Sequence, residues 1–145
     1  MQTSDPPPVL DEHTAAHVAE LFSAFSDTSR VRILFAIVET QLLRDFLTDP
    51  PANGVIFLHS AAQSIFAGSC GERYPPSDAL AEIYAKGSGY PFKEHFTAYP
   101  VTGSAVDWLA RVGIPAIEVE LTNHQDLDWK QNLGGILLAL EFPSK

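Results

Sequence analysis

Residues 55–60, with the sequence Val-Ile-Phe-Leu-His-Ser, consist of four consecutive apolar side chains followed by a His-Ser pair. The run begins directly after Gly54, which closes a proline-containing turn. A short apolar run bounded in this way is typical of a strand that is covered on both faces in a mostly parallel sheet. The pattern therefore predicts a buried strand with His59 at its carboxyl end.

Residues 116–121, with the sequence Ala-Ile-Glu-Val-Glu-Leu, predict a second strand with a different pattern. Successive side chains of a strand point to opposite faces of the sheet. Glu118 and Glu120 therefore share one face, and the apolar residues between them share the other. We expect the two carboxylates to point the same way, an arrangement that is usually found on a face that meets solvent.

Helical patterns alternate with these strands. Three helices are predicted to begin at the capping residues Ser77, Ser104 and Asp128, and the first two are predicted to stop at Gly87 and Gly113. Strands that alternate with helices indicate an α/β layered domain, with a mostly parallel or mixed sheet and flanking helices.

The N-terminal part of the chain predicts additional helices. Residues 11–38 carry apolar side chains at helical spacing, and a break at Ser26 and Asp27 divides them into two short amphipathic helices. Residues 40–47 continue the pattern, and the prolines within residues 49–54 end it.

Composition excludes several classes of function. The 145 residues suffice for one domain with a core, and the formal net charge of −9 disfavours contact with phosphate backbones, so we expect no nucleic-acid partner. Cys70 is the sole cysteine, which excludes an internal disulfide and a multi-cysteine zinc site. No apolar run approaches about 18 residues, and the N-terminus is acidic and proline-rich. We expect no membrane partner, no export signal and a cytoplasmic location.

Three segments follow one another in an informative order: the strand that ends in His59, the segment 99–108 (Tyr-Pro-Val-Thr-Gly-Ser-Ala-Val-Asp-Trp), and the strand that contains Glu120. They resemble the third zinc ligand, the mobile tyrosine and the catalytic glutamate of zinc carboxypeptidases of the carboxypeptidase A family. Residues 39–46 resemble the helix that precedes the third ligand in that family. The resemblance covers residues 38–145 and corresponds to the C-terminal half of such an enzyme.

The resemblance implies a role for each matching residue. His59 would bind zinc, and Glu120 would act as the catalytic proton acceptor and donor. Tyr99 would bind the terminal carboxylate of a peptide substrate, and Val106 would line the specificity pocket, where an apolar residue disfavours a basic side chain. Intact relatives hydrolyse a C-terminal peptide bond, in bacterial branches that of a cell-wall peptide. A histidine at a strand end is, taken singly, more often a hydrogen-bonded structural residue than a ligand.

The family supplies its first two zinc ligands as a His-x-x-Glu pair that precedes the third ligand. In this chain that spacing occurs once, at His17 and Glu20, inside a predicted helix and not after a strand and glycine turn. One histidine holds zinc poorly, because metal sites derive their affinity from several preorganised ligands. The resemblance therefore implies a truncated domain that is weakly active or inactive, so we leave open whether the protein is an enzyme.

Residues 21–34 resemble a different family, the ArsR-type winged-helix repressors, of which they match the opening helices. The recognition helix, the β-wing and the cysteine metal motif of those repressors do not follow. We therefore divide the chain into a repressor-like helical segment, residues 1–37, and a carboxypeptidase-like part, residues 38–145. The alternative function is a non-enzymatic regulatory or dimerisation module. Such a module would self-associate through the N-terminal helices or through an exposed sheet edge.

Overall fold

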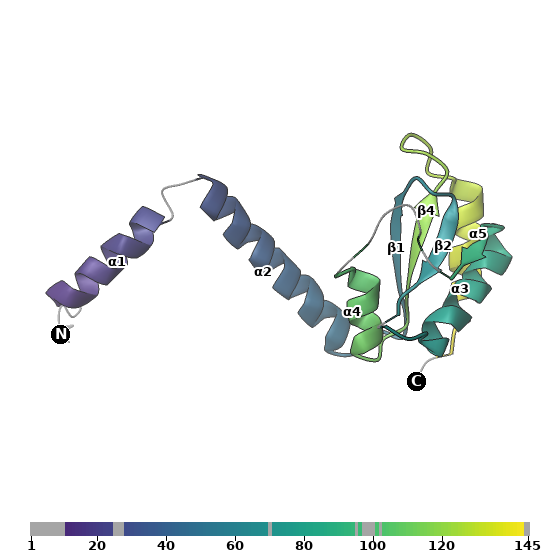
Figure 1. Ribbon diagram of the computed structural model, residues 1–145, viewed down its shortest axis with the longest axis horizontal. Coiled ribbons are helices and arrows are strands. Elements are labelled where there is room, and N and C mark those ends of the chain that lie inside the picture. Colours follow the sequence, from purple (N-terminus) through teal and green to yellow (C-terminus); the bar gives the residue numbers. More distant parts are fainter. Residues whose placement is uncertain are drawn as a thin grey trace, which may run out of the picture. The chain divides into compact units, whose positions relative to one another are not determined.

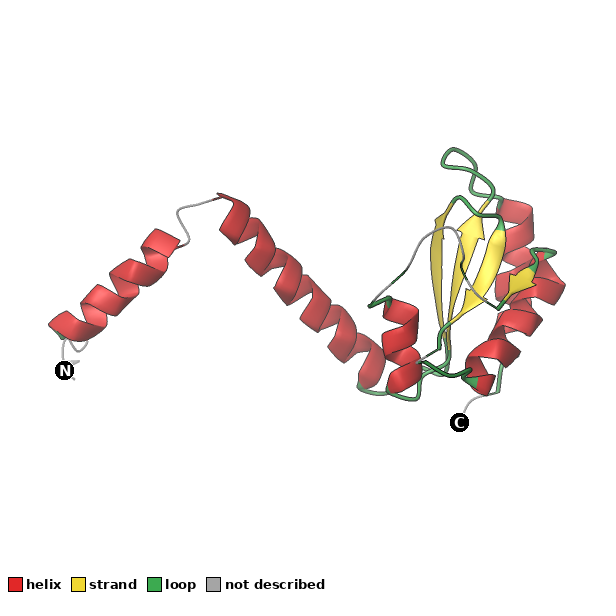
Figure 2. Ribbon diagram, in the orientation of Figure 1, coloured by secondary structure: helices red, strands yellow, loops and turns green. Residues whose placement is uncertain are grey.

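The computed structural model describes residues 11–24, 28–69, 71–94, 96, 101 and 103–143. The chain divides into two compact units, Met1–Thr48 and Asp49–Lys145. Figure 1 shows the elements in chain order, and Figure 2 shows that the first unit is helical and that the strands belong to the second.

The first unit contains helices α1 (Glu12–Ala24) and α2 (Thr28–Thr48). Asp11 caps α1, since its Oδ1 accepts a hydrogen bond from the Thr14 backbone N–H at 2.8 Å. The break expected at Ser26 and Asp27 lies outside the described residues. Helix α2 continues through the segment that the sequence suggested as a further helix, and the position of a junction near residue 37 stays a prediction.

The second unit is built on a four-stranded sheet within the described residues. Its strands are β1 (Val55–Ser60), β2 (Ser64–Ala67), β3 (Phe92–Lys93) and β4 (Ala116–Leu121), in the order β1-β4-β2-β3. Strands β1 and β4 are parallel, β2 and β3 are parallel, and β2 runs antiparallel to β4. The expected α/β class with a mixed sheet is therefore confirmed.

Strand β1 begins at Val55, as predicted, and extends one residue beyond His59, but its environment differs from the prediction. It lies at one end of the strand order and pairs with β4. Its first three residues are half-buried, and Leu58, His59 and Ser60 are exposed. The expectation of a strand covered on both faces is wrong for this carboxyl half, because its three consecutive side chains point alternately to the two faces and all three are exposed.

Three helices complete the unit: α3 (Pro75–Ser88), α4 (Ala105–Arg111) and α5 (Trp129–Ala139). The capping role predicted for Ser104 is confirmed, as its side chain accepts from the Asp107 N–H. Ser77 does not cap α3 but lies inside it, and its buried Oγ accepts from the Ala116 N–H at 3.0 Å. Asp128 occupies the N-cap position of α5 without a side-chain capping bond.

The predicted stop at Gly87 is wrong, because α3 ends at Gly89, which has a φ of 77°. Gly87 instead permits close helix packing: a Cβ atom there would lie 2.2 Å from the Gly134 carbonyl oxygen of α5. Helices α3 and α5 therefore approach so closely that their backbones touch where they meet.

Helices α3 and α5 cover one face of the sheet, and α4 lies on the other side (Figure 1). The core between the sheet and α3 includes Ile65, Ile117 and Val119 from the strands and Leu80 and Tyr84 from the helix. The alternate residues of the strands consequently point toward the side of α4, and this second face carries the polar side chains described below. Among the described residues, no helix has the length and apolar character needed to cross a membrane.

Candidate metal centre

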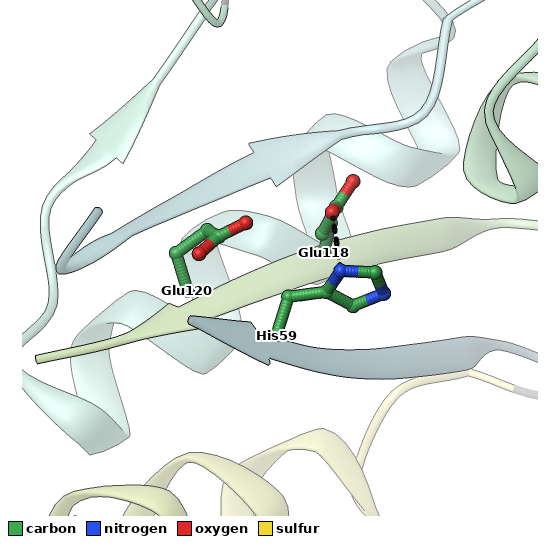
Figure 3. Close-up of side chains that lie close together, drawn as sticks. All are labelled: His59, Glu118 and Glu120. Carbon is green, nitrogen blue, oxygen red and sulfur yellow. Dashed lines mark ion pairs between the residues drawn. The ribbon is translucent and has the colours of Figure 1, made fainter. Parts of the chain in front are cut away.

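Three potential metal ligands come from two neighbouring strands. His59 on β1 is the register partner of Glu120 on β4, and Glu118 precedes Glu120 by two residues on the same strand. Register partners in a sheet point to the same face, as do residues two apart along a strand. Figure 3 shows the three side chains on the same side of the two strands.

The ligand atoms of these residues are close together. His59 Nδ1 lies 3.2 Å from Glu118 Oε1, and one ligand atom from each of the three residues lies within 4.8 Å of the others. Burial increases across the group: the side chains of His59 and Glu118 are 56% and 25% exposed, whereas Glu120 as a residue is 9% exposed. The cluster thus extends from solvent at His59 to the interior at Glu120.

Glu120 has an unsatisfied oxygen. Its Oε2 atom is buried and has no hydrogen-bond partner among the described residues. Leaving a buried polar atom without a partner costs roughly 1–3 kcal/mol, and such atoms are rare in folded proteins. The position therefore favours a bound donor or cation.

The cluster lies in a cleft of about 480 Å³ between the second face of the sheet and α4. Phe66 and Phe96 form part of its wall, with ring centroids 5.5 Å apart in an edge-to-face contact. Val106 lines the cleft from α4 and is buried. The apolar wall and the polar cluster therefore face one common space.

The described lining of the cleft is acidic. Its ionisable side chains are four carboxylates and one imidazole: Glu94, Asp107, Glu118, Glu120 and His59. The pKa of Glu118 is raised above its usual value, chiefly by burial, and Glu120 and Asp107 add to this because like charges disfavour ionisation. His59 opposes the shift. A cation bound in the cleft would relieve this repulsion.

Helix α4 is fixed against the end of β2 by two contacts. Asp107 Oδ1 accepts from the Ser69 N–H at 2.8 Å. A Cβ atom on Gly68 would lie 2.2 Å from the Val106 carbonyl oxygen, so the backbone of this glycine touches that of the helix. These contacts hold the α4 wall of the cleft in place.

Of the residues that the sequence singled out, His59, Glu120 and Val106 line this one cleft. Tyr99 lies outside the described residues. His17 and Glu20 lie on α1, as the helical pattern predicted, and therefore in the other unit.

The sequence assigned no function to Glu118 or to the Ser60–His124 pair. Glu118 was expected on the face of Glu120 but received no function, although the shared strand parity was a usable signal. Ser60 Oγ lies 2.7 Å from His124 Nδ1, a contact between an exposed strand end and a distant loop that no local pattern indicates. The pair is exposed.

No family model matches this chain, and no curated protein or solved structure matches it either. The geometry of the cleft and the residues that line it are therefore the basis for assigning a function.

Proposed function

We propose that the second unit is a truncated zinc-carboxypeptidase-like domain that retains part of a peptidase site. One observation carries the proposal: the expected metal ligand His59 and the expected catalytic residue Glu120, which are far apart in the chain, are register partners on parallel strands. Val106, the expected specificity residue, lines the same cleft. Intact enzymes of this kind hydrolyse a C-terminal peptide bond, and the substrate class would be a peptide or a cell-wall peptide.

Each retained residue has a chemical role in this proposal. Zinc, when bound, would lower the pKa of water and polarise the scissile carbonyl. His59 would contribute one imidazole ligand from the exposed end of β1. Glu120 would accept the proton of the attacking water and pass it to the leaving amine. Tyr99 would donate a hydrogen bond to the terminal carboxylate of the peptide.

The proposed activity is weak or absent for two reasons. The His-x-x-Glu pair that would complete the peptidase zinc site does not precede β1 in a strand-and-turn context. The described lining of the cleft also contains no Lys or Arg to attract the carboxylate of a peptide terminus, and four carboxylates repel it. The open edge of β1, beside His59, is where additional sheet from a partner would complete the site.

Zinc titration by calorimetry tests this proposal. His13 and His17 stack on α1 with ring centroids 4.5 Å apart and could bind zinc on their own, so both are replaced by alanine in every protein compared. In that background we expect His59→Ala to abolish zinc binding, with His124→Ala as the matched control. Hydrolysis of a peptide with an apolar C-terminal residue should be lost in Glu120→Gln. Identical isotherms for the His59 variant and its parent would refute the metal role of His59.

A second candidate function is self-association, which the surface of α2 favours. This helix exposes large apolar side chains, and Phe35, Leu42 and Phe46 lie on one face of it at helical spacing, the last being 77% exposed. An exposed apolar face of this kind is typical of a surface that binds another protein chain. We expect analytical ultracentrifugation to show a concentration-dependent dimer that Leu42→Glu dissociates and that the control Glu39→Gln leaves intact. A strictly monomeric parent protein would exclude this function.

A further inference from the structure

We propose that His59, Glu118 and Glu120 together form a three-ligand site for a divalent transition-metal ion, with Zn²⁺ or Mn²⁺ as the ions of matching chemistry. The inference rests on the proposed function for the cleft and for His59 as a ligand, but it changes the roles of both glutamates. Glu118, which the carboxypeptidase resemblance leaves without a role, becomes a ligand. Glu120 becomes a ligand as well, and the site needs no His-x-x-Glu pair.

The spacing of the three side chains suits one ion. Two ligands of a tetrahedral zinc ion, each at about 2.0–2.2 Å from it, stand roughly 3.4 Å apart. The 3.2 Å between His59 Nδ1 and Glu118 Oε1 already matches that separation, and the remaining pairs lie within 4.8 Å. Binding of one ion would require rotation of the carboxylate side chains to shorten the longer separations.

The unsatisfied oxygen of Glu120 is an independent indication. The site comprises more than a group of surface acids, since Glu120 is about nine-tenths buried and its Oε2 has no donor among the described residues. A buried carboxylate oxygen without a donor remains a cost to the fold unless a water or a cation satisfies it. Because this side chain shares its face with Glu118 and His59 (Figure 3), a cation there meets all three residues.

The charges around the cluster distinguish a cation from an anionic ligand. Glu94 and Asp107 line the same cleft as the cluster. Arg73 does not line the cleft, and its guanidinium group forms ion pairs with Glu94 at 2.7 Å and with Asp78 at 3.0 Å. An acidic cleft of this kind concentrates cations and repels carboxylates. The charge of the cleft therefore favours binding of a metal ion over binding of an anionic ligand.

The donor set narrows the choice of ion. One imidazole with two carboxylates suits zinc and manganese, whereas calcium and magnesium prefer sites made of oxygen alone. Three protein ligands leave at least one position for water or another small ligand. A Glu120 that coordinates metal is no longer free to act as a base, so this site binds metal independently of peptide hydrolysis.

Metal titrations of the full chain, in the background that lacks His13 and His17, test the inference. The variants are His59→Ala, Glu118→Gln and Glu120→Gln, and the control is Glu94→Gln, which removes a charge from the cleft but not from the cluster. Circular dichroism spectra verify that each variant is folded, and Glu118→Ala serves as a second variant at that position. Zn²⁺ is followed by calorimetry, and Mn²⁺ by the loss of its free-ion paramagnetic resonance signal.

We expect each cluster variant to weaken Zn²⁺ binding by at least about tenfold, since even residues that only support metal ligands contribute 10–100-fold. The control should retain the parent affinity. Loss of binding in His59→Ala with parent affinity in both Glu118 variants would overturn this inference and leave the proposed peptidase-like site standing. Parent affinity in all variants would overturn both the three-ligand site and the proposed peptidase-like site. If Glu94→Gln weakened Zn²⁺ binding as much as the cluster variants do, the loss would reflect the general acidity of the cleft, and the three-ligand site would be overturned.

Discussion

Replacing Gly134 by alanine should destabilise the second unit, although alanine favours helices. The added Cβ would lie 2.4 Å from the Gly87 carbonyl oxygen, an atom of the α3 backbone that cannot move alone. Forcing an extra methyl group into a packed contact costs about 1–3 kcal/mol. The gain from replacing glycine inside a helix is about 0.5–1 kcal/mol. We therefore expect a net loss of about 1–2 kcal/mol.

Urea unfolding followed by circular dichroism measures this loss, and thermal unfolding should show a midpoint lower by about 4–8 °C for each kcal/mol in a domain of this size. Gly54→Ala is the matched control, because its Cβ would meet side-chain atoms and no backbone: Leu80 at 3.2 Å, which can adjust, and Phe142 at 3.8 Å. A Gly134→Ala protein as stable as the parent, or more stable, would refute the close contact between α3 and α5.

Three other predictions concern buried or paired side chains. Tyr84→Phe should cost about 1–3 kcal/mol in urea unfolding, because the buried Tyr84 hydroxyl donates to Asn132 Oδ1 at 2.8 Å and its loss leaves that oxygen unpaired; an unchanged midpoint would contradict the bond. In metal-free buffer Glu118→Gln should be more stable than the parent at pH 7, since burial raises the pKa of Glu118 and its ionisation costs stability as pH rises through that pKa. Thermal melts should show this advantage vanish below pH 4.5, the ordinary value, and an advantage that persists there would exclude titration as its cause. Asp128→Asn should be less stable than the parent at pH 7, because the hydrogen bond from the Tyr90 hydroxyl lowers the pKa of Asp128. The difference in stability should narrow as pH falls through the lowered pKa, and a difference that does not change with pH would contradict the role of the charged carboxylate.

The strands that carry the site were predictable because their patterns are local. The apolar run 55–58 lies in a strand that begins at Val55 and carries His59 near its carboxyl end, and the alternation in residues 116–121 corresponds to a strand with the same bounds. Strand β2, in contrast, corresponds to none of the predicted elements, since four residues give too short a pattern to recognise. Its place between β4 and β3 depends on pairing with distant residues.

Two errors arose where a side chain serves a distant partner. Ser77 has the composition of a helix cap, but its hydroxyl bonds to the Ala116 backbone, 39 residues away. Gly87 resembles a helix stop, but it lies within α3 because Gly134 packs against it. Local capping rules cannot distinguish these cases, since the competing interactions are tertiary.

The candidate site was predictable in part. The order of segments pointed to His59 and Glu120, and strand parity placed Glu118 beside Glu120. The expectation that this carboxylate face meets solvent fails at Glu120, which is buried between the sheet and the wall of the cleft. Burial at that position depends on α4, whose packing against β2 and β4 is not encoded in the strand itself.

A crystal structure of the protein grown with Zn²⁺, analysed by anomalous diffraction at the zinc edge, tests the central claim most directly. The arrangement of β1 and β4 predicts a zinc peak at about 2.0–2.2 Å from a nitrogen of His59 and from carboxylate oxygens of Glu118 and Glu120. A fully folded protein that shows no peak in this cleft, or a peak bound by other residues alone, would contradict it.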